Sequence, residues 1–547
     1  MFVRIIQRFF YAIAILIFLI ALGLRLVYLE QRADLHIDEG LSIVLSEYND
    51  YGWGKFYPEG TILDAHTLKE KLLWNDATIS GALNDIFKLW KNNRDIPHTN
   101  LYYSLFRLWH IGFADNEIKS LFYRGVSLNF VFFILSFCFA FCLVKKLLYA
   151  MDSDSDKTLV QIAILVFLSL SFLNPASITN TLFMRPYMLQ ECLLMMFLWA
   201  NTNLFCCLQG YQRQGYFANN VFPKELRKQI WRLSFLLVVL TSFFLLSGYF
   251  GALFVCMVFI TCGVYVAVYI KRYIYIYITL ASLVLTPLLY PKYFRGFLKD
   301  RGVEARQKIS LEYLSDSIGS ITESFFTLLY THLGLLLSIL LLCSFVWFCV
   351  QFIKAKSLRY IMQNNLIVFY SLCALVWMFL VIFVAPYKTL RYIMPAFPVL
   401  LLCVPYLLCY LREITITKTR SYLLAICISC VVLSNVLYLS LYGNRVENIA
   451  QTVARQIALL EQKTSDSLVA ISIQESANYA ILIPHITAGH YMFFHNCAKL
   501  QESLSNPEQK FAALIIERGT CKNVIQTIAR VSTREELGGL VIFYFSK

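Results

Sequence analysis

Blocks of apolar residues alternate with short polar segments along most of the chain. An α-helix needs about 20 apolar residues to cross roughly 30 Å of hydrocarbon, and these blocks have that length. They lack the period-2 alternation of a membrane β-barrel. The pattern therefore predicts an α-helical polytopic membrane protein with about eleven transmembrane helices. The predicted spans cover residues 9–29, 124–149, 158–175, 186–208, 232–248, 249–270, 273–290, 325–352, 365–386, 390–411 and 421–442.

Two regions outside the spans have patterns of their own. The first external loop, residues 30–123, carries apolar residues at helical spacing in 79–90 and again in 101–109, which predicts amphipathic helices lying at the membrane interface. Residues 444–547 alternate strand-like and helix-like segments and predict a small α/β domain behind a transmembrane domain of residues 1–443. Its strands are expected at 468–473, 511–516 and 540–545, and its helices at 446–463 and 522–530.

Composition agrees with a membrane protein, because 58% of the residues are hydrophobic and only 15% are charged. The net charge of +14 comes largely from short loops between spans, where the positive-inside rule explains it, so nucleic acid is not expected as a partner. A cytoplasmic N-terminus satisfies this rule, and an odd number of spans then places the C-terminal domain outside. The external loop 291–323 is also basic and includes Arg295; it is either a solvated loop or a site for an anionic ligand.

Cysteine usage adds one expectation. Fourteen of the sixteen cysteines lie in or beside apolar blocks, where free cysteine behaves as a small hydrophobe. Cys497 and Cys521 alone lie in the C-terminal domain, where oxidising conditions outside the cytoplasm would allow a disulfide. Two separate buried thiols are the alternative. The spacing of His485, His490 and His495 indicates no metal site.

Four polar clusters border predicted spans, and the predicted topology brings all of them to the extracytoplasmic face. They are Asp38 with Glu39; Asp95, His98, Tyr102 and Tyr103; Arg185 with Tyr187; and Lys388 with Arg391. A partly desolvated carboxylate can take a proton from a hydroxyl, and an arginine at this depth is unfavourable unless it pairs or meets a ligand. Solvated carboxylates, and an Arg185 that snorkels or pairs with Glu191, are the structural alternatives. Convergence of the clusters favours a functional site.

The order of these motifs resembles the GT-C superfamily of glycosyltransferases. Asp-Glu follows the first span, Leu-Tyr-Tyr at 101–103 precedes an interfacial helix, Arg-Pro-Tyr at 185–187 opens a span, and Arg-Tyr-x-x-Pro-x-x-Pro occupies 391–398. The chain is most similar to the family-39-like branch, which includes protein O-mannosyltransferases and the lipid A aminoarabinose transferase. The likeness covers roughly residues 1–410.

This resemblance implies roles for the clusters. Asp38 matches the family's essential acidic position, with Glu39 beside it. Arg185, Tyr187, Lys388 and Arg391, together with Arg295, are expected at the donor phosphate. The second-loop motif, with Tyr102 and Tyr103 and the preceding Asp95 and His98, is expected near the acceptor.

The expected protein is thus a hexosyl or pentosyl transferase of a bacterial inner (plasma) membrane. It would move a sugar from a polyprenyl-phosphate donor to a hydroxyl of a lipid, glycan or protein, with inversion and without a cofactor. The alternative is a lipid or oligosaccharide flippase or transporter, which would place its polar residues nearer the bilayer midplane.

Overall fold

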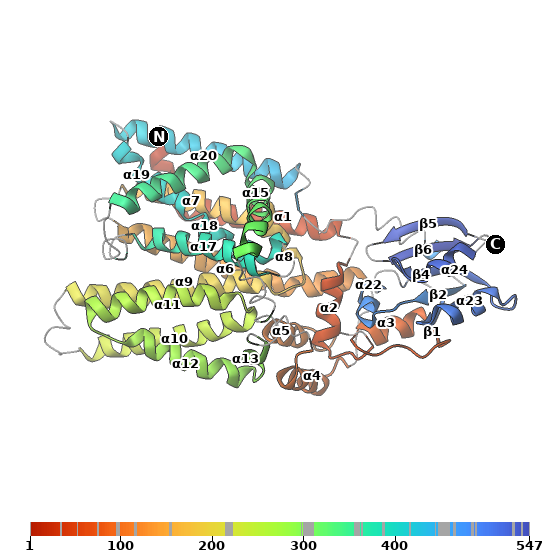
Figure 1. Ribbon diagram of the computed structural model, residues 1–547. Coiled ribbons are helices and arrows are strands. Elements are labelled where there is room, and N and C mark those ends of the chain that lie inside the picture. Colours follow the sequence, from red (N-terminus) through yellow and green to blue (C-terminus); the bar gives the residue numbers. More distant parts are fainter. Residues whose placement is uncertain are drawn as a thin grey trace.

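The computed structural model describes residues 2–32, 35–51, 53–73, 76–94, 99–113, 118–151, 156–213, 223–296, 298, 303, 311–354, 362, 365–385, 389–414, 417–442, 445–446, 460–462, 467–482, 486, 489–527, 531–537 and 540–545. Helices form a bundle at one end of the molecule, and a six-stranded sheet forms a separate layer at the other end (Figure 1). The elements of the first external loop lie between them.

Within the described residues, eight helices are long and apolar enough to cross a membrane. They are α1 (Phe2–Gln31), α6 (Ile118–Met151), α9 (Tyr187–Arg213), α10 (Lys224–Ser247), α11 (Gly251–Tyr265) with its extension η1 (Val266–Ile270), α15 (Leu311–Lys354), α17 (Leu366–Val384) and α20 (Lys418–Leu441). The predicted division between the fifth and sixth spans is present, because α10 ends before Gly248 and α11 starts at Gly251. The helix α15 is kinked at Gly334, whose φ of 70° suits glycine.

The remaining predicted spans are helical but differ in form. The predicted span 158–175 is α7 (Lys157–Phe172), and α8 (Pro175–Leu182) comes after it at a bend of 52°. The segment α12 (Ile274–Leu289) is short. The predicted span 390–411 is divided into η3 (Leu390–Tyr392), η4 (Met394–Ala396), α18 (Phe397–Leu400) and α19 (Cys403–Ile414). Pro395 and Pro398 explain this division, because proline provides no N–H for a continuous helical ladder.

The first external loop contains the two predicted amphipathic helices, α4 (Ile79–Lys91) and α5 (Leu101–Trp109). It also contains α2 (Ile37–Ser46), β1 (Ile62–Asp64) and α3 (Ala65–Leu73). In a different loop, the short α13 (Tyr293–Arg295) follows α12. On α4 the apolar residues Ile79, Leu83 and Phe87 are exposed, as expected for a helix that faces lipid. Its other face is joined to α5 by the buried pair of Asp85 and Arg107, whose Oδ2 and Nε are 3.0 Å apart.

The C-terminal domain holds the predicted strands as β2 (Leu468–Ser472), β4 (Phe511–Glu517) and β6 (Leu540–Phe545). The predicted helix at 522–530 is present as α24 (Lys522–Thr527). The structure adds β3 (His490–Phe494), β5 (Val531–Leu537), α22 (Tyr479–Leu482) and α23 (Cys497–Ser505). Strand order is β1-β3-β2-β4-β6-β5, with β2 parallel to β3 and β4 and the other pairs antiparallel. The predicted helix at 446–463 falls almost wholly outside the described residues.

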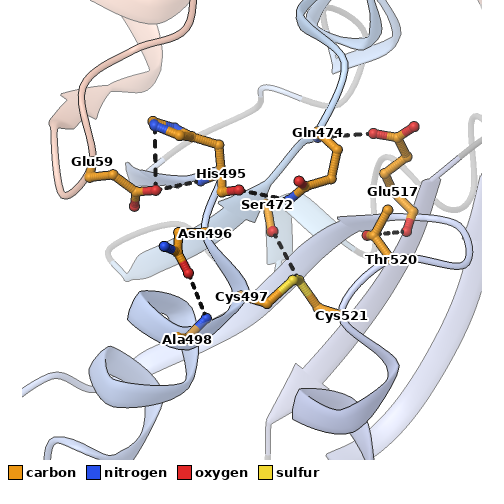
Figure 2. Close-up of a disulfide and its surroundings, with 10 residues drawn as sticks. All are labelled: Glu59, Ser472, Gln474, His495, Asn496, Cys497, Ala498, Glu517, Thr520 and Cys521. Carbon is orange, nitrogen blue, oxygen red and sulfur yellow. Dashed lines mark hydrogen bonds and ion pairs between the residues drawn. A yellow bond between two sulfur atoms is a disulfide. The ribbon is translucent and has the colours of Figure 1, made fainter.

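The strand β1 shows that the sheet is not built from the C-terminal segment alone. Ile62 pairs with Met492 across the edge of the sheet, so three residues of the first external loop belong to this layer. Nearby, Glu59 Oε1 accepts the backbone N–H of His495 at 3.0 Å (Figure 2). Residues 59–64 therefore join the segment between α1 and α6 to the C-terminal domain.

The two faces of the sheet have separate cores. Side chains such as Ile471, Phe493 and Ile515 face the same core as the bundle. Their neighbours, including Ala470 and Leu514, pack under α23 and α24. Between those helices Cys497 and Cys521 form a disulfide, with Cα atoms 5.4 Å apart (Figure 2).

Candidate active site

Three segments that are distant in sequence meet near the outer loops of the bundle: the N-terminus of α2, the link between α8 and α9, and η3. Their side chains join Asp38, Arg185 and Arg391, which belong to three of the four sequence clusters. Tyr103 of the remaining cluster contacts Arg185 from α5.

The start of α2 is a capping box, which explains why Asp38 and Glu39 occupy its first turn. His36 is the N-cap, and its Nδ1 accepts the backbone N–H of Asp38 at 3.1 Å. In return, Glu39 Oε2 accepts the backbone N–H of His36 at 3.0 Å. Carboxylates are also favoured here by the positive end of the helix dipole.

Glu39 is fully buried and both of its carboxylate oxygens have partners. Arg32 donates to each of them, from Nη1 to Oε1 at 3.0 Å and from Nη2 to Oε2 at 2.6 Å. The backbone N–H of Met184 adds a hydrogen bond to Oε1 at 2.9 Å. Glu39 thereby ties α1, α2 and the α8–α9 link together, and its geometry suits a structural role better than proton transfer.

Asp38 is the more accessible carboxylate, with 18% of its side chain exposed. Its Oδ2 forms an ion pair with Arg391 Nη1, and 23% of the Arg391 side chain is exposed. The Arg391 guanidinium lies 6.0 Å from the Phe183 ring and 5.8 Å from the Tyr392 ring. Its Nε is buried and has no hydrogen-bond partner within the described part of the chain. This pair presents both a base and a cation at the edge of the site.

Arg185 lies beneath this pair and is only 2% exposed. Its Nη1 contacts the Asp38 carbonyl at 3.1 Å, Tyr103 Oη at 3.0 Å and Ser42 Oγ at 3.3 Å. Glu191, the alternative partner considered from sequence, instead accepts hydrogen bonds from Ser136 and Asn180. Arg185 therefore faces the catalytic candidates and not the interior of α9.

Aromatic rings line one side of the site. Tyr187 stacks parallel to Phe183 at 6.1 Å and meets Tyr392 edge-on at 6.2 Å. Phe183 also meets the His36 ring edge-on at 5.4 Å. These rings cover part of the charged groups, and the lower local dielectric constant strengthens their electrostatic interactions.

The protonation state of His36 is set by its surroundings. Burial lowers the pKa of His36, and the nearby Arg391 and Arg185 lower it further, while Asp38 and Glu39 act in the opposite direction. Nδ1 lies 3.6 Å from Asp38 Oδ2, which by itself would suit an ion pair. The neutral ring prevails, because Nδ1 must remain unprotonated to accept the backbone N–H of Asp38.

The other predicted site residues are placed differently. Tyr102 is buried beside Tyr103, but its hydroxyl points to Asn129 Oδ1 at 3.4 Å. Arg295 is exposed at the end of α13 and contacts none of the residues above among those described. The predictions for Asp95, His98 and Lys388 fall outside the described residues.

Several contributors were not selected from the sequence, namely Arg32, Ser42, Phe183 and Tyr392. Ser42 lies one helical turn after Asp38, so helical spacing could have suggested it. Tyr392 lies within the Arg-Tyr motif itself. Arg32 had no such signal, because its pairing with Glu39 depends on the turn between α1 and α2.

The charges at the site favour an anionic ligand. Among the residues that the structure describes here, Arg32, Arg185 and Arg391 face two carboxylates, Asp38 and Glu39, so these five side chains carry one positive charge in excess. In the described part of the chain, no group of three or more His, Cys, Asp or Glu side chains could hold a metal ion. The arrangement can therefore accept a proton at Asp38 and hold a phosphate with guanidinium groups.

The sequence matches no family model and no curated protein sequence. Several solved structures resemble the chain over most of its length, among them the following two. Archaeal oligosaccharyltransferase AglB from Archaeoglobus fulgidus, in complex with an inhibitory peptide and a dolichol-phosphate, is 9% identical; the match covers 94% of this chain and 70% of that chain, with a TM-score of 0.49. ArnT from Cupriavidus metallidurans, bound to undecaprenyl phosphate, is 11% identical over 97% of each chain, with a TM-score of 0.48.

Because the identities are low and the TM-scores are below 0.5, no residue of this chain is assigned a role from either structure. Roles at the site therefore rest on the contacts described above.

Proposed function

We propose that this protein is an integral-membrane glycosyltransferase that moves a sugar from a polyprenyl-phosphate donor to an acceptor hydroxyl on the extracytoplasmic face. The ion pair of Asp38 and Arg391, partly exposed above the buried Arg185, carries the proposal. It supports a site in which Asp38, whose carboxylate can deprotonate a hydroxyl, directly contacts two guanidinium groups that can bind a phosphate.

Asp38 is the proposed general base. It takes the proton of the acceptor hydroxyl while that oxygen forms a bond to the anomeric carbon of the donor sugar. The bond from the anomeric carbon to the phosphate oxygen breaks, and its electron pair leaves with the lipid phosphate. A single displacement of this kind inverts the anomeric centre.

Arg391 and Arg185 are the proposed phosphate ligands. Negative charge grows on the phosphate as it leaves, and guanidinium groups in a site partly closed to water stabilise that charge. Arg391 lies at the surface of the site and can exchange Asp38 for the phosphate, which frees the carboxylate to take the hydroxyl proton. Arg185 keeps its place through Tyr103 and Ser42.

Binding of undecaprenyl phosphate to the purified protein in detergent tests the phosphate site. Loss of one charge-assisted hydrogen bond costs about 1–3 kcal/mol, so Arg391→Gln and Arg185→Gln should each raise Kd by about five- to 150-fold. Arg124→Gln is the matched control, because the Arg124 guanidinium bonds to the Trp109 carbonyl and lies over the Phe113 ring, two residues that do not belong to the site. Equal Kd values for the wild type and both site variants would remove these arginines from the phosphate site.

Transfer itself is measured with membranes that contain the protein and radiolabelled undecaprenyl-phosphate sugars. At least one donor should lose its sugar to an acceptor, and Asp38→Asn should abolish that transfer. Movement of the donor across the bilayer without cleavage of the sugar–phosphate bond would instead establish the transporter alternative.

A further inference from the structure

A second set of buried charges lies within the bundle, behind the candidate active site. Arg25 of α1 is fully buried and uses its whole guanidinium. Nε donates to Thr181 Oγ1 at 2.9 Å and Nη2 donates to Ser177 Oγ at 2.7 Å, so both contacts hold α8. Nη1 donates to the carbonyl oxygens of Ala21 at 2.8 Å and Phe172 at 3.0 Å.

Glu191 of α9 reaches α8 from another helix. It is 1% exposed, and Asn180 of α8 donates to its Oε2 at 3.4 Å while Ser136 of α6 donates to its Oε1 at 3.2 Å. Asn180 directly precedes Thr181, the partner of Arg25. The short helix α8 thus lies between a buried cation on α1 and a buried anion on α9.

Such charges are costly in segments that span a membrane, and they mark function unless a pair explains them. Here the network coincides with the 52° bend between α7 and α8. Phe172 is the last residue of α7, and Arg25 satisfies a carbonyl that the bend leaves without a helical partner. The network therefore stabilises a break in the bundle.

The link between α8 and α9 connects this break to the candidate active site. The helix α8 ends at Leu182, whose carbonyl accepts a hydrogen bond from Arg32 Nη1. The link contains Met184, which binds Glu39, and then Arg185. Arg25 lies in α1, and Arg32 directly follows the last residue of that helix. Arg25 contacts Ser177 near the start of α8, and Arg32 contacts the Leu182 carbonyl at its end.

We propose that Arg25 and Glu191 are positioning residues, which fix α8 so that Arg185 is presented to the lipid phosphate. This inference rests on the proposed function of Arg185. Neither residue touches the ligand: Arg25 acts through Ser177 and Thr181, and Glu191 acts through Asn180. The bundle thereby sets the geometry of the phosphate site from within the membrane.

A double-mutant cycle on undecaprenyl phosphate binding tests the proposal with the full-length protein. Coupled networks of this kind change binding by about 0.5–2 kcal/mol, so Arg25→Gln should raise Kd by about two- to thirtyfold. Arg25→Lys keeps the positive charge but loses the planar guanidinium, so its Kd should lie between those of Arg25→Gln and the wild type. The double variant Arg25→Gln/Arg185→Gln should bind no more weakly than Arg185→Gln alone, because Arg25 has no further effect once Arg185 is gone.

Two controls separate positioning from folding. Asn201→Leu removes a fully buried amide bonded to Tyr370 and Tyr275, far along α9 from α8, and should lower stability without changing Kd. Where Arg25→Gln does not fold, Thr181→Val removes the hydroxyl that accepts from Arg25 Nε and leaves the guanidinium in place. Its matched control is Thr241→Val, since Thr241 Oγ1 has no hydrogen-bond partner among the described residues.

The outcomes are distinguishable. A raised Kd for Arg25→Gln or Thr181→Val that disappears in the Arg185→Gln background supports the proposal. Additive losses, or an unchanged Kd in folded Arg25→Gln and Thr181→Val, overturn it. An unchanged Kd for Arg185→Gln itself would instead overturn the phosphate site under "Proposed function".

Discussion

Neighbouring carboxylates in one helical turn should respond in opposite ways to the same substitution. Glu39→Gln leaves the guanidinium of Arg32 buried without its counter-charge and weakens the contact to Met184. Breaking a buried pair on one side costs about 3–5 kcal/mol. Asp38→Asn removes one partner of an ion pair whose side chains are 23% and 18% exposed, so its cost should be smaller than that of the fully buried pair.

The assay compares thermal unfolding in detergent with sugar transfer for both variants. We expect Glu39→Gln to unfold at a clearly lower temperature than the wild type. Asp38→Asn should unfold close to the wild-type temperature and yet transfer no sugar. Equal unfolding temperatures for the two variants would refute the structural role of Glu39. Full transfer activity in Asp38→Asn would refute the assignment of Asp38 as the general base.

Three further predictions concern the surroundings of the site. His36→Asn keeps a capping side chain that does not titrate. Because folding lowers the pKa of His36, the wild type should lose stability relative to this variant as pH falls below about 6.5. Thermal unfolding of both proteins at pH 7.5 and 5.5 measures the difference. Cys497→Ser opens the bridge to Cys521 and should destabilise the external domain by roughly 3 kcal/mol, seen as faster proteolysis of that domain. Asp85→Asn leaves Arg107 without its buried partner and should lower the unfolding temperature, with a cost of about 3–5 kcal/mol.

Periodicity accounts for much of the fold. Blocks of apolar residues predicted the helices of the bundle, and the i, i+4 spacing from Ile79 onwards predicted α4, because both signals are local. The strand β1 gave no such signal. It has three residues, and its partner Met492 is more than 400 positions away, so only the folded domain reveals the pairing.

The sequence predicted which residues lie close together at the candidate site, but not what each of them contributes. Topology brings clusters to one membrane face, which is why Asp38, Arg185 and Arg391 could be grouped from sequence. It does not say how deep each side chain lies. The burial of Glu39 depends on its contacts with Arg32 and with the Met184 backbone. These are tertiary contacts, which the pair Asp-Glu in the sequence does not reveal.

In the proposed mechanism Asp38 and Glu39 have different roles. A base must be within reach of the incoming hydroxyl, so a carboxylate whose oxygens are all enclosed by its own ion pair and backbone contact, as in Glu39, is poorly placed for that role. Glu39 instead joins α2 to the link that carries Arg185. Glu39 therefore helps to set the distance between the proposed base, Asp38, and the proposed phosphate ligand, Arg185, and a change at Glu39 should disturb both residues together.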